Sequence, residues 1–256
     1  MVLLYSIIFF ILGICMGSFF GVVGTRLPNK ESIIKPNSYC NNCKKELAWY
    51  NLIPLLSFVI QGGKCSFCKT KLSIKYFLYE LLTGILYVIG YLIFDLSPEL
   101  IIYITFVSTL VIVIISDIEY MIILDEVLII GSILLVIELF IFKDLNFVLI
   151  SLLSAVISFL GMWGIKLLGD FIFKKESMGG GDIKLMFLIG LLFSLEGSLL
   201  TIFISSFIAL PYAFIVLIRK KENIVPYGPF ISIAAILLFC LKLNDFNLNM
   251  LIELIS

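Results

Sequence analysis

The sequence contains no histidine among its 256 residues, and only 14% of them are charged. Without an imidazole, the chain has no Ser-His-Asp triad, no Cys-His dyad and no His-Glu-x-x-His metalloprotease motif. The scarcity of charge, beside 61% hydrophobic residues, argues against an ordinary soluble domain. The net charge is zero and no repeat or low-complexity linker stands out, so nothing suggests nucleic-acid binding. We therefore expect an all-α polytopic membrane protein.

Long apolar runs recur along the chain, and about 20 helical residues cross a hydrocarbon core. We predict about eight transmembrane helices, which divide the chain into a first helix at 1–24, a loop domain at 25–76 and a membrane domain at 77–256. If the short sixth run and the seventh form one re-entrant unit, the later topology changes. The eight runs are residues 2–24, 77–94, 99–116, 121–142, 147–168, 183–195, 198–218 and 228–243.

Basic residues indicate the orientation, because Lys and Arg collect in cytosolic loops. They concentrate after the first, fifth and seventh runs, which predicts a cytosolic loop domain and both termini outside. The basic residues in or directly beside those connections are Arg26, Lys30, Lys35, Lys44, Lys45, Lys64, Lys69, Lys71, Lys75, Lys166, Lys174, Lys175, Lys184, Arg219, Lys220 and Lys221.

Two aspartates are expected at the same cytosolic face. Asp117 ends the third run and Asp182 precedes the sixth, so two further spans separate them. Two close carboxylates share a proton, and such a pair hydrolyses a peptide bond without a metal, one group activating water and the other acting on the carbonyl oxygen. The sequence does not assign these two roles. Alternatively, Asp117 and the acids that follow it, Glu119, Asp125 and Glu126, only solvate a short turn.

Three glycines, Gly179 to Gly181, directly precede Asp182. Glycine permits a positive φ and lets another backbone approach closely, so a substrate strand has room beside this segment. A plain flexible loop is the alternative explanation. Lys184 either tunes the charge of the aspartate pair or anchors the sixth helix at the cytosolic face.

Four cysteines in the loop domain form two Cys-x-x-Cys pairs, Cys40 with Cys43 and Cys65 with Cys68. This spacing is typical of four thiolates around a structural zinc ion. Disulfides are disfavoured in a reducing cytosol, and iron would imply electron transfer that nothing else supports. The remaining cysteines, Cys15 and Cys240, lie inside apolar runs and are expected to be inert.

A membrane transporter or scaffold is the rival interpretation, with the cysteines binding a partner and the acids forming an ion path. Glu138 is a further acid inside an apolar run, without an evident partner in the sequence. An ion path needs polar residues through the depth of the bundle, whereas Asp117 and Asp182 are expected at one surface. That difference favours hydrolysis.

Motifs along nearly the whole chain resemble those of type IV prepilin peptidases, membrane aspartyl enzymes of pilus, type II secretion and competence systems. Beside the cysteine pairs and the segment Gly179–Lys184, they are Gly17-Ser18-Phe19, Arg26-Leu27-Pro28, residues 51–57, Gly63, Tyr76, Glu80, Ser116-Asp117-Ile118 and residues 226–230.

The resemblance implies a GxGD-type aspartyl protease of the bacterial cytoplasmic membrane, with Asp117 and Asp182 as its catalytic residues. Its expected substrates are prepilins or pseudopilins, whose basic leader is cut off after a glycine at the cytosolic face. It also implies S-adenosylmethionine-dependent N-methylation by the loop region. The sequence departs from the family at Gly21, Gly62, Phe77 and Leu124, which replace residues often found there, whereas the aspartates match.

Overall fold

Every regular element in the part of the chain that the structure describes is a helix. The computed structural model describes residues 1–40, 42–176, 178–218 and 225–242, and no strand occurs in them. The chain divides into two units, Met1–Leu100 and Ile101–Ser256. The all-α fold that the composition predicts is confirmed.

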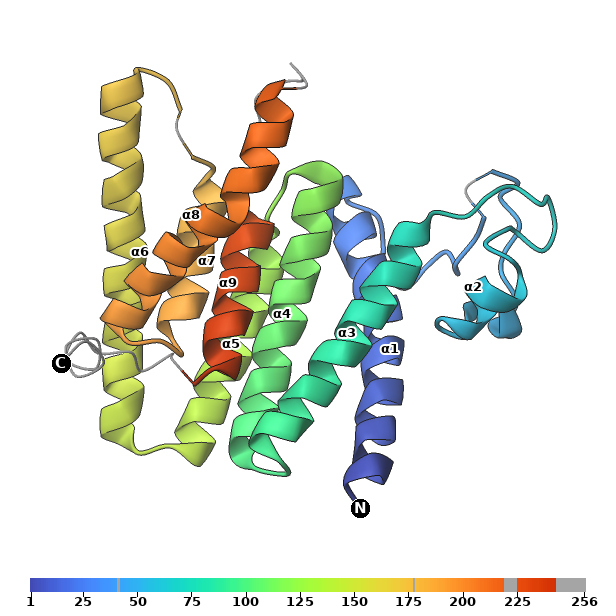
Figure 1. Ribbon diagram of the computed structural model, residues 1–256, viewed down its shortest axis with the longest axis horizontal. Coiled ribbons are helices and arrows are strands. Elements are labelled where there is room, and N and C mark those ends of the chain that lie inside the picture. The colour runs from blue at the N-terminus through green and yellow to red at the C-terminus, as the bar shows by residue number, and fades with distance from the viewer. Residues whose placement is uncertain (41, 177, 219–224, 243–256) are drawn as a thin grey trace. The chain divides into compact units, whose positions relative to one another are not determined.

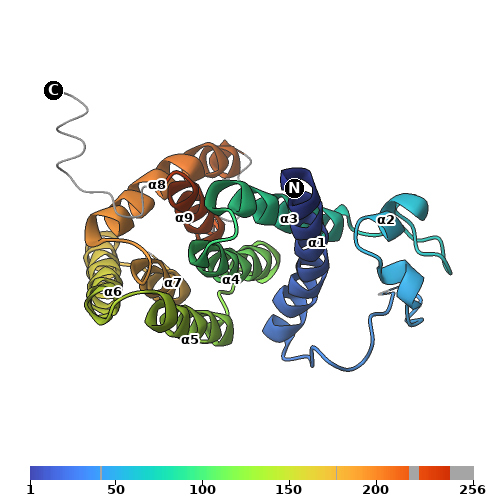
Figure 2. The same ribbon diagram turned by 90° about the horizontal axis from the view of Figure 1, so that it is seen from below.

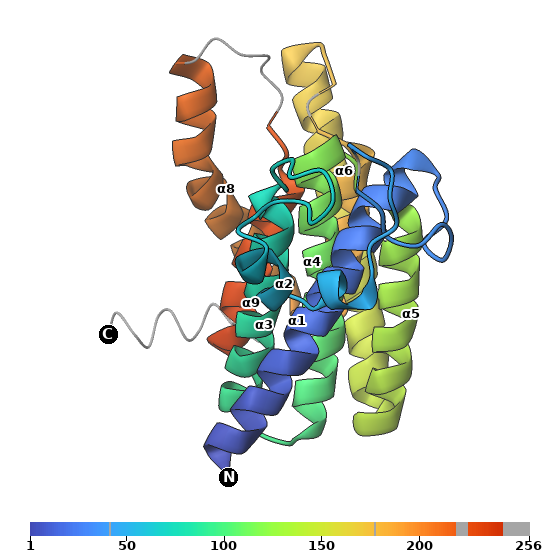
Figure 3. The same ribbon diagram turned by 90° about the vertical axis from the view of Figure 1, so that its right-hand side faces the viewer.

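The first unit contains two long helices, α1 (Val2–Arg26) and α3 (Ile74–Phe94), which cross closely. Small residues make this crossing possible, since a Cβ on Gly13 would lie 2.8 Å from the Cα of Gly84, and one on Gly17 would lie 2.8 Å from the Thr83 hydroxyl. Between the helices runs a loop, visible in Figure 3, with three short helices: η1 (Leu27–Asn29), η2 (Trp49–Leu52) and α2 (Leu56–Ile60).

The second unit is a helical bundle (Figure 1). Its helices are α4 (Pro98–Tyr120), α5 (Asp125–Phe142), α6 (Leu145–Phe173), α7 (Gly180–Gly190), α8 (Leu195–Ile218) and α9 (Gly228–Cys240). The short α7 packs against α5, α6, α8 and α9, and Figure 2 shows it among its neighbours in a view from below. The sequence of α7 is apolar on nearly all sides, and most of its side chains are buried against these neighbours.

Each of the eight predicted runs contains a helix, but among the described residues five helices are long and apolar enough to cross a membrane: α1, α3, α4, α6 and α8. The helices α7 and α9 have 11 and 13 residues, and α5 starts at Asp125 rather than at residue 121. The count of eight spans therefore stays a prediction. Three of the basic residues used for the orientation, Arg219, Lys220 and Lys221, lie outside the described residues.

Candidate active site

Asp117 lies in the last turn of α4, where its side chain is buried. Its Oδ2 accepts a hydrogen bond of 3.0 Å from the backbone N–H of Gly228, the first residue of α9. The next residue, Pro229, has no N–H, and the N–H of Phe230 bonds to the Tyr227 carbonyl. The Gly228 N–H is therefore a helix N-terminal donor left open for an anion, and the carboxylate of Asp117 occupies it.

Asp182 lies in the first turn of α7 and is also buried. The backbone N–H of Gly179, the N-cap residue of the helix, favours the ionised form of its carboxylate. Each aspartate thus lies near a backbone N–H at the start of a helix, where the helix dipole favours negative charge.

Burial, followed by the negative charge of Asp117, raises the pKa of Asp182 to about 7, although the Gly179 N–H opposes the shift. Two interacting carboxyls titrate as a pair, so a single shared proton is favoured near neutral pH. A pair in that state offers one carboxylate that can take a proton and one carboxyl that can give one. This is the chemical requirement for metal-free attack of water on a peptide carbonyl.

The glycine segment opens a helix. Gly180 and Gly181 lie in the first turn of α7, and among the described glycines only Gly62 and Gly63 have a positive φ. The positive φ that glycine permits is therefore not used at Gly179 to Gly181. At Gly181 the missing side chain makes room for a neighbouring side chain, since an added Cβ would lie 2.7 Å from the Cβ of Ile123. The room for a substrate strand stays a prediction.

The ion pair of Lys184 is with neither Asp117 nor Asp182. Lys184 follows Asp182 by two residues in α7, so its side chain points about 200° around the helix from that of Asp182. Its Nζ instead lies 2.6 Å from Asp125 Oδ2, and both side chains are about half exposed. The ion pair joins the second turn of α7 to the first turn of α5. It also lies in the lining of a cavity of about 530 Å³ between α5, α6 and α7.

Of the other acids considered, Glu126 is exposed at the start of α5 and Glu119 is partly exposed. Glu138 does have a partner, since its Oε1 accepts a hydrogen bond of 2.6 Å from the Thr105 hydroxyl. A hydrogen bond between α4 and α5 thus accounts for one carboxylate oxygen of an acid that looked isolated within its apolar run in the sequence.

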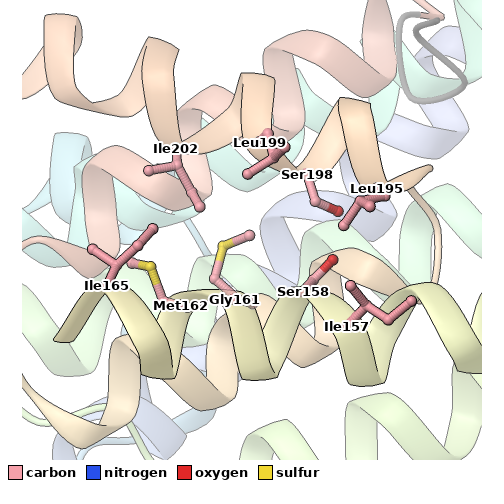
Figure 4. Close-up of a pocket in the computed structure, with 10 residues that line it drawn as sticks. Ile157, Ser158, Gly161, Met162, Ile165, Leu195, Ser198, Leu199 and Ile202 are labelled. Atoms are coloured by element: carbon pink, nitrogen blue, oxygen red, sulfur yellow. The ribbon is translucent and has the colours of Figure 1, made fainter. Parts of the chain in front are cut away.

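A second cavity, of about 260 Å³, lies between α6, α7 and α8 (Figure 4). The hydroxyls of Ser158 and Ser198 face it, and neither has a hydrogen-bond partner among the described residues. Neither Asp117 nor Asp182 lines this cavity. It is therefore distinct from the candidate active site.

The four loop cysteines come together as the spacing predicts. Their Sγ atoms all lie within 4.8 Å of one another, and those of Cys40 and Cys68 are 3.8 Å apart. Tetrahedral coordination with metal–sulfur bonds of about 2.3 Å separates the sulfurs by about 3.8 Å. The geometry and the four soft donors therefore fit a tetrahedral metal ion, and no disulfide joins these cysteines.

The two cysteine pairs have matching backbone geometry. In each, the N–H of the first cysteine bonds to the carbonyl five residues later, at 3.0 Å for Cys40 and 2.9 Å for Cys65. The residue after each pair, Lys44 or Lys69, has a positive φ. Hydrogen bonds from the Cys43 and Asn42 backbone lower the pKa of Cys40, which favours the thiolate that binds metal.

The remainder of the loop is fastened to the helices of the same unit. The guanidinium of Arg26 donates to the carbonyls of Ser32 and Pro36 at 3.1 and 2.8 Å. Glu80 of α3 accepts a hydrogen bond of 2.8 Å from the N–H of Leu55, a residue with a φ of 59°. These contacts explain two motif residues by their role in holding the loop.

Two features of the candidate active site were missed in the sequence. The first is the hydrogen bond from Gly228 to Asp117, for which a glycine before a proline at the start of a helix was the available indication. The second is Ile123, which contacts the segments of both aspartates and had no distinguishing pattern in the sequence.

Comparison with known proteins agrees with these features. Residues 11–94 match the family model of the bacterial peptidase A24 N-terminal domain, and residues 104–214 match that of the type IV leader peptidase family. The chain is 33% identical over 246 residues to a prepilin leader peptidase/N-methyltransferase of Bacillus subtilis, covering 91% of this chain and 92% of that protein.

Two further relatives carry the same name. The protein from Vibrio cholerae is 30% identical over 269 residues, covering 92% of this chain and 96% of the relative. The protein from Pseudomonas aeruginosa is 29% identical over 255 residues, covering 88% and 86%. No solved structure matches the chain.

Proposed function

This chain belongs to the type IV leader peptidase family, and we propose that it removes the basic leader from type IV prepilins or pseudopilins, with Asp117 and Asp182 as its catalytic residues. The observation that carries the proposal is the pair of buried carboxyls at the starts of α7 and α9, with Asp117 bonded to the Gly228 N–H and the charge of Asp117 acting on Asp182. The relatives' shared name supplies the substrate class.

Hydrolysis by this pair needs one proton shared between the two carboxyls. The ionised carboxylate accepts a proton from water as the water oxygen bonds to the scissile carbonyl carbon, and the protonated carboxyl donates to the carbonyl oxygen. The tetrahedral intermediate then collapses and the carbon–nitrogen bond breaks. The leaving nitrogen takes the proton that the first carboxylate accepted from water, and the re-forming carbonyl returns its proton to the second carboxylate. The roles of Asp117 and Asp182 stay interchangeable here.

The substrate is cut after a glycine at the cytosolic boundary of its hydrophobic helix. In this proposal the enzyme spans the bacterial cytoplasmic membrane with its N-terminus on the outer side. Asp117 and Asp182 lie at the cytosolic face. The acids that follow Asp117 along the chain, Glu119, Asp125 and Glu126, would attract a basic leader, and Asp125 also forms an ion pair with Lys184. Gly179 and Gly181 support the pair from the start of α7.

The second proposed reaction is methyl transfer from S-adenosylmethionine to the new N-terminal amine, which the relatives' name includes. We assign it to the region of the loop at 25–76. The ion held by Cys40, Cys43, Cys65 and Cys68 is zinc in this proposal, and its role is structural, because four protein thiolates leave no open coordination position. When bound, zinc supplies a fixed crosslink between the two cysteine pairs.

The function is tested with the purified protein in lipid bilayers and a prepilin carrying a basic leader. Mass spectrometry should find the mature product cut after the glycine, and added S-adenosylmethionine should increase its mass by one methyl group. A substrate in which that glycine is replaced is the control and should stay uncut. Absence of cleavage by the folded protein would overturn the proposal and favour the transporter or scaffold.

A further inference from the structure

The short connection between α4 and α5, residues 121–124, touches the segments that carry both aspartates. An added Cβ on Gly181, beside Asp182, would lie 2.7 Å from the Cβ of Ile123. An added Cβ on Gly228, whose N–H bonds to Asp117, would lie 3.0 Å from the Cδ1 of the same isoleucine. One side chain therefore fills the space between the start of α7 and the start of α9.

This connection is fixed at both of its ends. The N–H of Met121 donates to the backbone carbonyl of Asp117 at 2.9 Å, and Met121 adopts a φ of 56°. Leu124 is buried and accepts the N–H of Leu128 at the start of α5. Because its neighbours on both sides are held, Ile123 cannot move away freely when something presses on it.

We propose that Ile123 is a positioning residue that sets the spacing between Asp117 and Asp182 by packing against Gly181 and Gly228. The inference deepens the proposed function and rests on it. Close-packed interiors transmit a displacement of a few tenths of an ångström, and the two carboxyls must stay close enough to share a proton. Glycine is required at position 181 because Ile123 occupies the place of its side chain.

The adjacent glycine provides a matched control. Around Gly180, which lies in the same first turn of α7, an added Cβ would meet nothing within 4 Å. Alanine at either position makes the same chemical change to the same helix. Only Gly181→Ala presses on Ile123.

The test compares prepilin cleavage by the wild type, Gly180→Ala, Gly181→Ala and the double variant Gly181→Ala with Ile123→Gly. Membrane levels and thermal unfolding of each are measured alongside. We expect Gly180→Ala to stay within about twofold of the wild type and Gly181→Ala to lose at least about tenfold in kcat with little change in KM. The double variant moves the glycine to the other side of the contact, so it should regain at least about threefold over Gly181→Ala.

A second double variant sharpens the expectation. An added Cβ on Gly228 would also lie 2.8 Å from Asp117 Oδ2, so Ile123→Gly should not rescue Gly228→Ala. Two results would overturn the proposed positioning role of Ile123. One is an equal loss of cleavage in Gly180→Ala and Gly181→Ala, and the other is a double variant, Gly181→Ala with Ile123→Gly, that is no more active than Gly181→Ala alone. Failure of the wild type to cleave would instead overturn the proposed function, so the two failures are distinguishable.

Discussion

The cysteine cluster and the aspartate pair are assembled in opposite ways. Cys40 and Cys68 are 28 residues apart, within one loop, and two short turns with matching hydrogen bonds present all four thiols. The carboxylate of Asp117 accepts its hydrogen bond from Gly228, which lies 111 positions later in the sequence and on another helix. The first site therefore depends on local geometry, and the second depends on how helices pack.

The largest expected effect concerns the local site. Cys65→Ser removes one of four thiolates, so the metal content of the purified protein should fall from about one ion per chain to near zero. Elemental analysis of the bound metal makes the measurement. Cys15→Ser, in α1 and outside the cluster, should leave the metal content unchanged, and full metal retention in Cys65→Ser would show that the cluster does not bind as described.

The comparison also explains how much the sequence could predict. The cysteine cluster followed from spacing alone, because consecutive turns fix the distances between the cysteines of each pair. Asp117 and Asp182 followed from topology and family motifs, but the partner Gly228 did not. Its contact forms only when α9 packs beside α4, and no local pattern encodes that packing.

Helix boundaries show the same limit. An apolar run predicts burial in protein or lipid without telling one from the other, so the enclosed α7 looked like a membrane span in the sequence. Glycine residues leave a similar ambiguity in the sequence. Absence of a Cβ serves close packing as well as unusual backbone angles, and here packing against Ile123 is what the structure shows.

An intermediate effect is expected at the aspartate pair, the site that depends on helix packing. In Gly228→Ala the new methyl group would lie 2.8 Å from Asp117 Oδ2, so the carboxylate or the start of α9 must shift. We expect cleavage to fall at least about tenfold, or about 1.4 kcal/mol of transition-state stabilisation. The assay uses the same prepilin, and Gly164→Ala in α6, where an added Cβ meets nothing within 4 Å, serves as the control.

The smallest effect is expected at Lys184. Its ion pair with Asp125 is half exposed, and such pairs contribute about 0–1 kcal/mol. Lys184→Gln should therefore lower kcat by less than about threefold and leave the protein folded. A loss as large as that in Gly228→Ala would mean that the lysine acts on the aspartate pair after all.

The central claim is that Asp117 and Asp182 together form the peptidase site. The most direct measurement is the rate of prepilin cleavage by purified Asp117→Asn and Asp182→Asn, with Asp125→Asn as the matched control from the same cluster of acids. The account predicts that each of the first two loses at least about a hundredfold while the control stays near the wild type. Cleavage at the wild-type rate by either Asp117→Asn or Asp182→Asn would contradict it.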